Sequence, residues 1–233
     1  MVTIDNYLDS HYIHRSNWLR ATVLGANDGI ISISSLAIGV AAASSAREPI
    51  ILATVAGLVA GALSMAAGEY VSVSSQTDTE KADIERERKE LHEMPEDELN
   101  MLAQIYERRG LKKETARQVA IELTEKDALG THIRDELGIN EISQAKPIQA
   151  AFASGISFTV GGILPLLVIL VAPVKGMEYW LYGFSIVFLV ILGITSAKTG
   201  GASISKAILR ITIWGTIAMG LSALAGYLFG VNV

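Results

Sequence analysis

Residues 50–75 read IILATVAGLVAGALSMAAGEYVSVSS, a run of small and aliphatic residues in which Glu69 is the only charged side chain. A helix needs about 20 such residues to cross the roughly 30 Å of hydrocarbon in a bilayer. Apolar runs of this length are typical of transmembrane helices and not of soluble domains. The run therefore predicts a membrane-spanning helix and an integral membrane protein.

Four more apolar runs lie on either side of this one, one before it and three after it. They cover residues 22–46, 147–172, 177–197 and 207–233. Each approaches or exceeds the length that a membrane crossing requires. Half of the whole chain is hydrophobic, and its mean hydropathy is +0.38. The fold class predicted from these runs is an all-α integral membrane protein with five transmembrane helices.

The charged residues gather in one block between the second and third runs. Of the 24 Asp and Glu residues, 18 lie between Asp78 and Glu141, and 12 of the 19 Lys and Arg residues lie between Lys81 and Lys146. This pattern predicts three parts. Residues 1–76 hold an N-terminal segment and transmembrane helices 1 and 2, residues 77–146 form a polar helical domain inserted between helices 2 and 3, and residues 147–233 hold helices 3–5.

Several classes of protein are excluded by composition. The chain has no cysteine, which excludes disulfides, thiolate metal sites and iron–sulfur clusters. Its net charge of −5 is not that of a nucleic-acid-binding protein, which carries an excess of basic residues. No nucleophile–base pair, phosphate-binding loop or Glu-x-x-His motif is present, so we do not expect an enzyme. Residues 1–20 lack the features of a secretory signal peptide.

Basic residues near the ends of the spans predict the orientation. When five helices are threaded alternately, the side of the polar block carries five short-loop basic residues and the opposite side carries two: Arg15, Arg20, Lys198, Lys206 and Arg210 against Arg47 and Lys175. We therefore expect the N-terminus and the polar domain to be cytoplasmic. The compact length and the lack of a targeting segment favour a prokaryotic plasma membrane.

The polar block is expected to contain three helices. The first continues directly from the second transmembrane helix and ends before Pro95, which together with the acidic residues after it is typical of a new helix N-terminus. Arg108, Arg109 and Gly110 are typical of that second helix's C-terminus. A third helix is predicted from residue 113 to about residue 137, because apolar residues recur at spacings of three and four, and it ends at Gly138.

Carboxylate and soft side chains recur on common faces of these helices. Spacings of three or four residues relate Asp83, Glu87 and Glu90, then Glu98 and Met101, then His132 and Glu136. Such a mixture suits Fe²⁺ or Mn²⁺ better than Ca²⁺. From spacing alone a solvated charged face is the favoured interpretation, because basic residues interleave with the acids. The missing Glu-x-x-His motif argues against a ferritin-like di-iron bundle.

Polar residues inside the spans suggest a second candidate site. A carboxylate at the centre of a bilayer costs roughly 2.5–3.5 kcal/mol, so Asp28 is expected to face a pathway or a partner. Met65 and Glu69 are four residues apart on the second span. Together the three side chains form a set that can pass a cation. The alternatives are a satisfied hydrogen bond for Asp28, contact with interfacial water for Glu69 and core packing for Met65.

Glycines recur at short intervals in three of the spans. Such spacing lets helix backbones approach closely, either within one subunit or at an interface between subunits. The pairs are Gly57 with Gly61, Gly161 with Gly162, and Gly226 with Gly230.

Specific motifs add to this interpretation. Residues 25–30 read GANDGI and residues 65–72 read MAAGEYVS, and these resemble the first and second helices of the vacuolar iron transporter family. Residues 105–111 (IYERRGL) and 135–138 (DELG) are similar to segments of that family's cytoplasmic metal-binding domain, and residues 162–166 (GILPL) to its third span. The resemblance covers nearly the whole chain in one order.

This resemblance implies a homodimer with five transmembrane helices per subunit, a cation path near the dimer axis, and export of Fe²⁺ from the cytoplasm in exchange for protons. It places Asp28 and Met65 on the intramembrane metal path with Glu69 in the adjoining motif. It also implies cytoplasmic metal-binding roles for Glu87, Glu90, Glu98 and Glu136. Met101 and His132 depart from the family pattern, which usually has a glutamate and a methionine there.

The sequence as a whole predicts a proton-coupled transporter of divalent transition metals, Fe²⁺ or Mn²⁺, with no permanently bound cofactor. The cytoplasmic helices would capture the ion on six side chains, Glu87, Glu90, Glu98, Met101, His132 and Glu136, and pass it by Glu69 and Met65 to Asp28. The partners would be metal ions, protons, lipid and a second copy of the chain. The alternative is a membrane-anchored metal buffer or sensor that binds ions without moving them.

Overall fold

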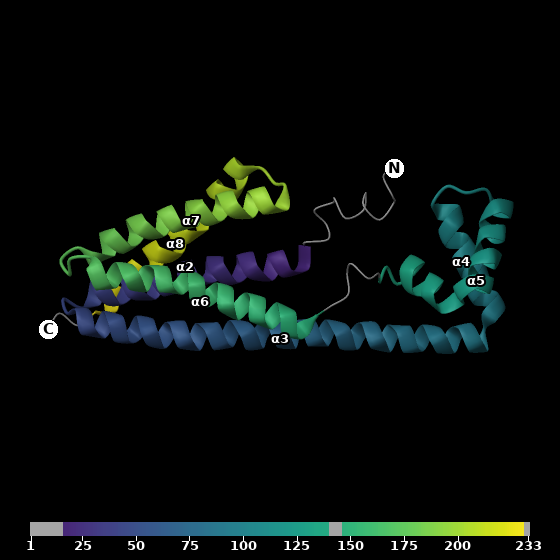
Figure 1. Ribbon diagram of the computed structural model, residues 1–233, viewed down its shortest axis with the longest axis horizontal. Coiled ribbons are helices and arrows are strands. Elements are labelled where there is room, and N and C mark those ends of the chain that lie inside the picture. Colours follow the sequence, from purple (N-terminus) through teal and green to yellow (C-terminus); the bar gives the residue numbers. More distant parts are fainter. Residues whose placement is uncertain (1–15, 140–145, 231–233) are drawn as a thin grey trace, which may run out of the picture. The chain divides into compact units, whose positions relative to one another are not determined.

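The computed structural model describes residues 16–139 and 146–230, so the expectations for Arg15 and for the first 15 residues fall outside the described part (Figure 1). The described residues form seven helices and no strand. The helices are α2 Ser16–Ala43, α3 Arg47–Glu93, α4 Pro95–Arg108, α5 Lys113–Asp135, α6 Pro147–Val171, α7 Met177–Gly200 and α8 Ile204–Phe229.

Five of these helices, α2, α3, α6, α7 and α8, are long and apolar enough to cross a membrane, by length and composition. They coincide with the five runs found in the sequence, within a few residues at most ends. The turn between α6 and α7 contains Gly176, whose φ of +76° lies in the left-handed region that favours glycine. The all-helical integral membrane class predicted from the sequence agrees with this architecture.

The chain divides into two compact units. One contains α2, α3 as far as Val71, α6, α7 and α8, and the other contains α3 from Ser72 onward, α4 and α5. We refer to them as the apolar unit and the polar unit. Helix α3 passes from one into the other as a single helix of 47 residues, as the sequence predicts.

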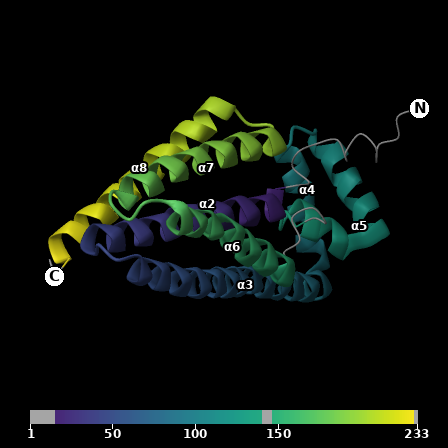
Figure 2. The same ribbon diagram turned by 60° about the vertical axis from the view of Figure 1, so that its left-hand side comes forward.

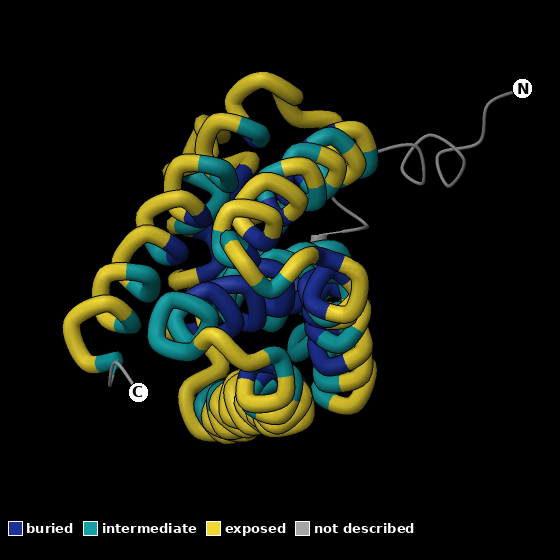
Figure 3. The backbone as a smooth tube through the Cα atoms, turned by 90° about the vertical axis from the view of Figure 1, so that its left-hand side faces the viewer, coloured by how far each residue is buried: buried dark blue, intermediate teal, exposed yellow. Residues whose placement is uncertain are grey.

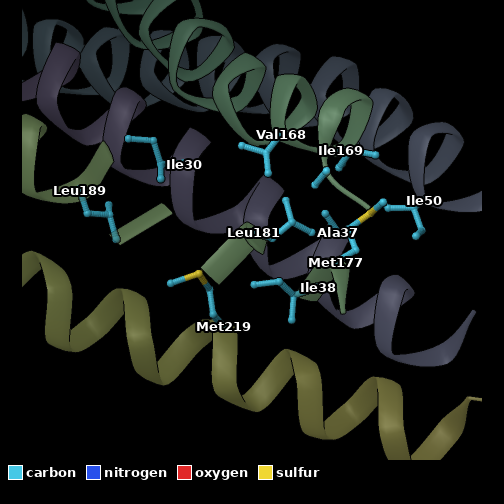
Figure 4. Packing of buried hydrophobic residues seen from close by; sticks show 11 residues of the cluster. Ile30, Ala37, Ile38, Ile50, Val168, Ile169, Met177, Leu181, Leu189 and Met219 are labelled. Atoms are coloured by element: carbon cyan, nitrogen blue, oxygen red, sulfur yellow. The ribbon is translucent and has the colours of Figure 1, made fainter. Parts of the chain in front are cut away.

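Helix α2 is the centre of the apolar unit, where it contacts α6, α7 and α8 (Figure 2). The buried core combines aliphatic and methionine side chains from these helices and from the start of α3 (Figure 4). Its labelled members are Ile30, Ala37, Ile38, Ile50, Val168, Ile169, Met177, Leu181, Leu189 and Met219. In this unit buried residues face inward, and exposed apolar residues cover the outer sides of the helices (Figure 3). That distribution is expected of helices whose outer sides face lipid.

Glycines allow α2 and α6 to approach closely. A Cβ atom at Gly29 would overlap the carbonyl oxygen of Phe158, and one at Gly161 would overlap the carbonyl oxygen of Ala26. The glycine pairs found in the sequence pack within one subunit: Gly57 meets Leu36, Gly61 meets Phe158, Gly162 meets Leu58 and Ile33, Gly226 meets Gly39, and Gly230 meets Ala43. These paired glycines therefore serve the packing of the apolar unit itself.

Gly161→Val is expected to lower the free energy of unfolding by about 1–3 kcal/mol, the usual cost of overpacking a core. The reason is that the added side chain has no room against the backbone of Ala26. A thermal unfolding assay of the detergent-purified protein measures this as a lower Tm. Gly183→Val is the matched control, because a Cβ at Gly183 on α7 meets nothing within 4 Å. Equal Tm values for the two variants would contradict the proposed close packing of α2 and α6.

In the polar unit most helix boundaries agree with the predicted signals. Helix α3 ends at Glu93, α4 begins at Pro95 and ends at Arg108, and Gly110 follows with a φ of +103°. The prediction of one continuous third helix is wrong at Asp127. This residue lies inside α5 with a non-helical φ of −165° and ψ of 84°, so α5 consists of two helical segments joined by a kink.

Candidate metal centre

Four side chains predicted as metal ligands converge in the polar unit. Glu87 comes from α3, Glu98 from the first turn of α4, His132 from the last turn of α5, and Glu136 follows directly after α5. One ligand atom from each lies within 4.8 Å of the others. We call these four residues the Glu–His cluster. Because the ligands come from three different helices, spacing along one helix could not have shown that they meet.

The His132 imidazole is the centre of the cluster. Its Nδ1 atom lies 2.8 Å from Glu87 Oε1, 3.0 Å from Glu136 Oε2 and 3.7 Å from Glu98 Oε2. A ring nitrogen carries at most one proton, so it can donate to only one of these three carboxylates. For comparison, adjacent ligands of an octahedral ion at 2.0–2.1 Å from the metal are about 3 Å apart. The spacing of the cluster suits a shared cation better than a single proton.

Burial makes this arrangement costly without a cation. The side chains of His132, Glu87 and Glu98 are 0%, 1% and 5% exposed. The Nδ1 atom of His132 is hydrogen-bonded to Glu136 Oε2, so Glu87 Oε1 beside it, Glu98 Oε2 and His132 Nε2 are left with no hydrogen-bond partner among the described residues. A buried charge that is neither paired nor hydrogen-bonded is strongly unfavourable. These atoms are therefore not part of a solvated charged face, the interpretation that spacing alone favoured.

The same burial changes the acid–base properties of the cluster. Desolvation, followed by repulsion from Glu136, raises the pKa of the Glu87 carboxyl and that of the Glu98 carboxyl above their ordinary value, although His132 opposes both shifts. Both carboxyls therefore hold their protons to a higher pH than a free glutamate does. A cation that binds to them must displace those protons.

A second set of polar contacts holds the end of α5 against α4. Arg109 donates to Asp135 Oδ1 at 2.6 Å and to the Asp135 carbonyl at 3.1 Å, while the Tyr106 hydroxyl donates to Asp135 Oδ2 at 2.9 Å. Burial disfavours the charged Asp135, but hydrogen bonds from Arg109, Tyr106 and Arg134 outweigh it and lower its pKa. Asp135 is therefore a charged anchor next to Glu136. The sequence analysis noted the motifs at residues 105–111 and 135–138 but gave no role to Tyr106, Arg109 or Asp135.

Two of the six predicted ligands in this unit lie outside the group of four. Glu90 pairs with Arg86, whose Nε lies 3.7 Å from Glu90 Oε2. Its charge also contributes to raising the pKa of Glu87 and of Glu98. Met101 is an exposed residue of α4. The described geometry thus brings four of the six candidates together, while Glu90 pairs with Arg86 and Met101 is exposed on α4.

The candidates in the apolar unit make separate contacts. Asp28 Oδ1 accepts a hydrogen bond from Ser32 Oγ at 2.6 Å. Met65 packs against the cluster of Ile33, Leu58 and Phe158, which fits the core-packing alternative. The Glu69 carboxylate lies 4.0 Å from the guanidinium of Arg20. The sequence analysis gave no role to Ser32, although its position one helical turn after Asp28 is a signal that could have found it.

Comparisons with known proteins agree with the motifs. The model of the VIT family matches residues 19–227. A vacuolar iron transporter from Acanthamoeba castellanii is 42% identical over 226 residues, covering 97% of this chain and 84% of the relative. Vacuolar iron transporter homolog 1 from Oryza sativa subsp. japonica is 35% identical over 223 residues, covering 95% and 78%. VIT-like transporter 1b from Glycine max is 32% identical over 223 residues, covering 95% and 80%.

Proposed function

The chain belongs to the VIT family, and on this premise we propose that it transports divalent transition-metal ions, Fe²⁺ or Mn²⁺, out of the cytoplasm in exchange for protons. The relatives are named as transporters, which supports a transport role over an enzymatic one. The Glu–His cluster is the capture site in this proposal. The cation is the transported substrate and not a resident cofactor.

The single observation that carries the proposal is the meeting of three carboxylates and one imidazole nitrogen within 4.8 Å in the polar unit. Carboxylate oxygen and imidazole nitrogen together suit borderline transition metals, whereas Ca²⁺ prefers six to eight oxygen ligands. Glu87 Oε1 and Glu98 Oε2, which have no hydrogen-bond partner among the described residues, gain ligand bonds when a cation binds, together with His132 Nδ1. Fe²⁺ and Mn²⁺ both fit this donor set.

Asp28 is the proposed carboxylate of the intramembrane path. It lies within α2, the helix that α6, α7 and α8 contact, and its described partner is the Ser32 hydroxyl. A carboxylate must be deprotonated to bind a metal, so protonation from the far side would release the ion there. This exchange supplies the coupling. Glu69 and Met65 are the proposed steps between the cytoplasm and Asp28.

Orientation and assembly complete the proposal. The polar unit faces the cytoplasm, because the ends of the apolar helices on its side of the predicted threading are richer in Lys and Arg. The protein works as a homodimer, as the resemblance to the family implies. Export from the cytoplasm has the same direction across a plasma membrane, which the sequence analysis expects, and across the vacuolar membrane that the relatives' names mention.

Metal flux in proteoliposomes tests the proposal directly. The purified protein is reconstituted, and uptake of Fe²⁺ and of Mn²⁺ is followed with and without an imposed pH gradient. We expect uptake of either ion to rise when the interior is acidic. Metal flux that does not change with the pH gradient would contradict the proton exchange but still support a metal transporter. Metal binding without flux, in vesicles shown to contain folded protein, would favour the buffer or sensor.

Metal affinity is expected to increase with pH. The raised pKa values of Glu87 and Glu98 mean that these carboxyls are protonated, and unable to bind a cation, at pH values where a free glutamate is already ionised. As the pH falls through these values, affinity should fall by up to about tenfold per pH unit for each proton displaced. Titration calorimetry in two buffers of different ionisation enthalpy measures the protons released.

The stability of the metal-free protein should change with pH in the opposite direction. A carboxyl whose pKa is higher in the folded state than in the unfolded state favours folding when protonated, so the free energy of unfolding decreases as the pH rises through the folded value. Glu96→Gln is the matched control for both measurements, because the Glu96 side chain is 79% exposed. Both the wild type and Glu96→Gln should bind metal more tightly as the pH rises. A metal affinity that does not change with pH in either protein would contradict ligation by the buried carboxyls.

A further inference from the structure

The kink inside α5 determines where two of the four cluster residues lie. Helix α5 packs on α4 through its first segment, where Ala116 and Ala120 are buried. In an unbroken helix of 3.6 residues per turn, His132 would lie about 120° around the axis from Ala120. It would then be directed away from the face that contacts α4. His132 is nevertheless fully buried among the carboxylates of α3 and α4.

Asp127 separates the two segments. Its extended backbone ends the first segment, and its Oδ1 accepts a hydrogen bond from the backbone N–H of Gly130 at 3.0 Å. This is the N-cap interaction, in which a side-chain oxygen three residues before satisfies a free N–H of a new helix. The segment after Asp127 therefore begins as a separate helix with its own direction, and α5 changes direction along its length (Figure 1).

Gly130 makes room for this cap. A Cβ atom at Gly130 would overlap the carboxylate of Asp127. The φ of Gly130 is not in the left-handed region, so the backbone itself does not require glycine there. A methyl group there would instead make the capping carboxylate of Asp127 move. Asp127 and Gly130 thus form one local device, and neither residue belongs to the Glu–His cluster.

We propose that Asp127, with Gly130, is a positioning residue for metal capture: by capping the second segment of α5 it sets the direction from which His132 and Glu136 meet Glu87 and Glu98. The inference rests on the proposed capture role of that cluster. Asp127 itself is exposed and lies outside the ligand group, so it acts through the two residues that it places.

Asp127→Ala removes the cap and puts the strongest helix former at the break, which favours a straight α5. We expect the full-length protein in detergent to bind Mn²⁺ about five- to tenfold more weakly, the size expected for the loss of one cap. Asp127→Asn should bind as the wild type does, because asparagine is an equally good cap. Glu125→Ala is the matched control, since it removes a neighbouring exposed acidic charge without touching the cap.

Gly130→Ala gives an independent test. In the wild-type background its methyl group displaces the capping carboxylate, and Mn²⁺ affinity should fall by a similar factor. In the Asp127→Ala background, Gly130→Ala should lower the Mn²⁺ affinity by less than about twofold, because the cap is already gone. Such non-additivity is expected of residues that act together. Independent effects of the two substitutions would overturn the proposal.

Two readouts separate positioning from a general loss of stability. A merely structural role would lower the Tm of the metal-free protein and leave the Mn²⁺ dissociation constant unchanged, whereas positioning weakens binding and reduces the rise in Tm that Mn²⁺ produces. If Asp127→Ala binds Mn²⁺ as tightly as the wild type while Glu87→Gln loses binding, the positioning role is wrong and the capture site stands. A wild type that does not bind Mn²⁺ would overturn both.

Discussion

Asp28→Ala is expected to abolish metal transport and to leave Mn²⁺ binding by the polar unit intact. The substitution removes the proposed ligand and proton acceptor inside the membrane, and Asp28 is far along the sequence from the Glu–His cluster. Flux in proteoliposomes should fall to the level of protein-free vesicles. The Mn²⁺ dissociation constant measured in detergent should remain within about twofold of the wild-type value, because the substitution changes no residue of the Glu–His cluster and lies in the other compact unit.

Asp28→Asn and Ser32→Ala make this prediction specific. Asparagine keeps the size of the side chain and its ability to accept from Ser32, but it cannot exchange a proton for a metal, so we expect the same loss of flux. Ser32→Ala removes one hydrogen bond to the carboxylate and should reduce flux without abolishing it. Normal transport by Asp28→Asn would show that Asp28 only satisfies an intramembrane hydrogen bond.

Glu87→Gln and His132→Ala are each expected to weaken Mn²⁺ binding by at least about 100-fold. Changes to residues that merely support metal ligands already cost 10–100-fold, and these two are proposed as the ligands themselves. Glu87 and His132 are fully buried in the polar unit, so no water replaces the lost ligand easily. Binding is measured by titration calorimetry on the full-length protein.

Glu85→Gln is the matched control for Glu87→Gln. Glu85 lies two residues earlier on α3, its side chain is 71% exposed, and it pairs with Arg88 at 2.7 Å. The Glu85→Gln variant should bind Mn²⁺ as the wild type does. Because Glu87→Gln removes a carboxyl with a raised pKa, its metal-free form should be no less stable than the wild type near neutral pH. Equal affinity in Glu85→Gln and Glu87→Gln would mean that the cluster does not hold the ion.

The spans were predictable because hydrophobic burial in lipid imposes one length and one composition on every crossing helix. The five apolar runs predicted the class, and Pro95 and Gly110 marked the ends of α4 by backbone chemistry that acts locally. The extension of α3 into the polar unit also follows from local features, since no Gly or Pro interrupts residues 69–93.

The convergence of the cluster could not be predicted in the same way. Periodicity places Glu87 on a face of α3 and His132 on a face of α5, but it does not state which faces meet. The kink at Asp127 shows the limit most clearly, because a continuous helix would have pointed His132 elsewhere. Asp127 is a residue type that is favoured at N-caps, but the apolar spacing of α5 on both sides of it predicts one helix.

Spectroscopy of bound Mn²⁺ tests the central claim, that the Glu–His cluster holds the ion, most directly. The chain has four histidines, and pulsed electron paramagnetic resonance detects a ligating imidazole through the coupling of its nitrogen to the Mn²⁺ electron spins. With ¹⁵N-labelled histidine we predict coupling to one nitrogen, lost in His132→Gln and retained in His92→Gln. Bound Mn²⁺ with oxygen ligands alone, or nitrogen coupling that survives His132→Gln, would contradict the account.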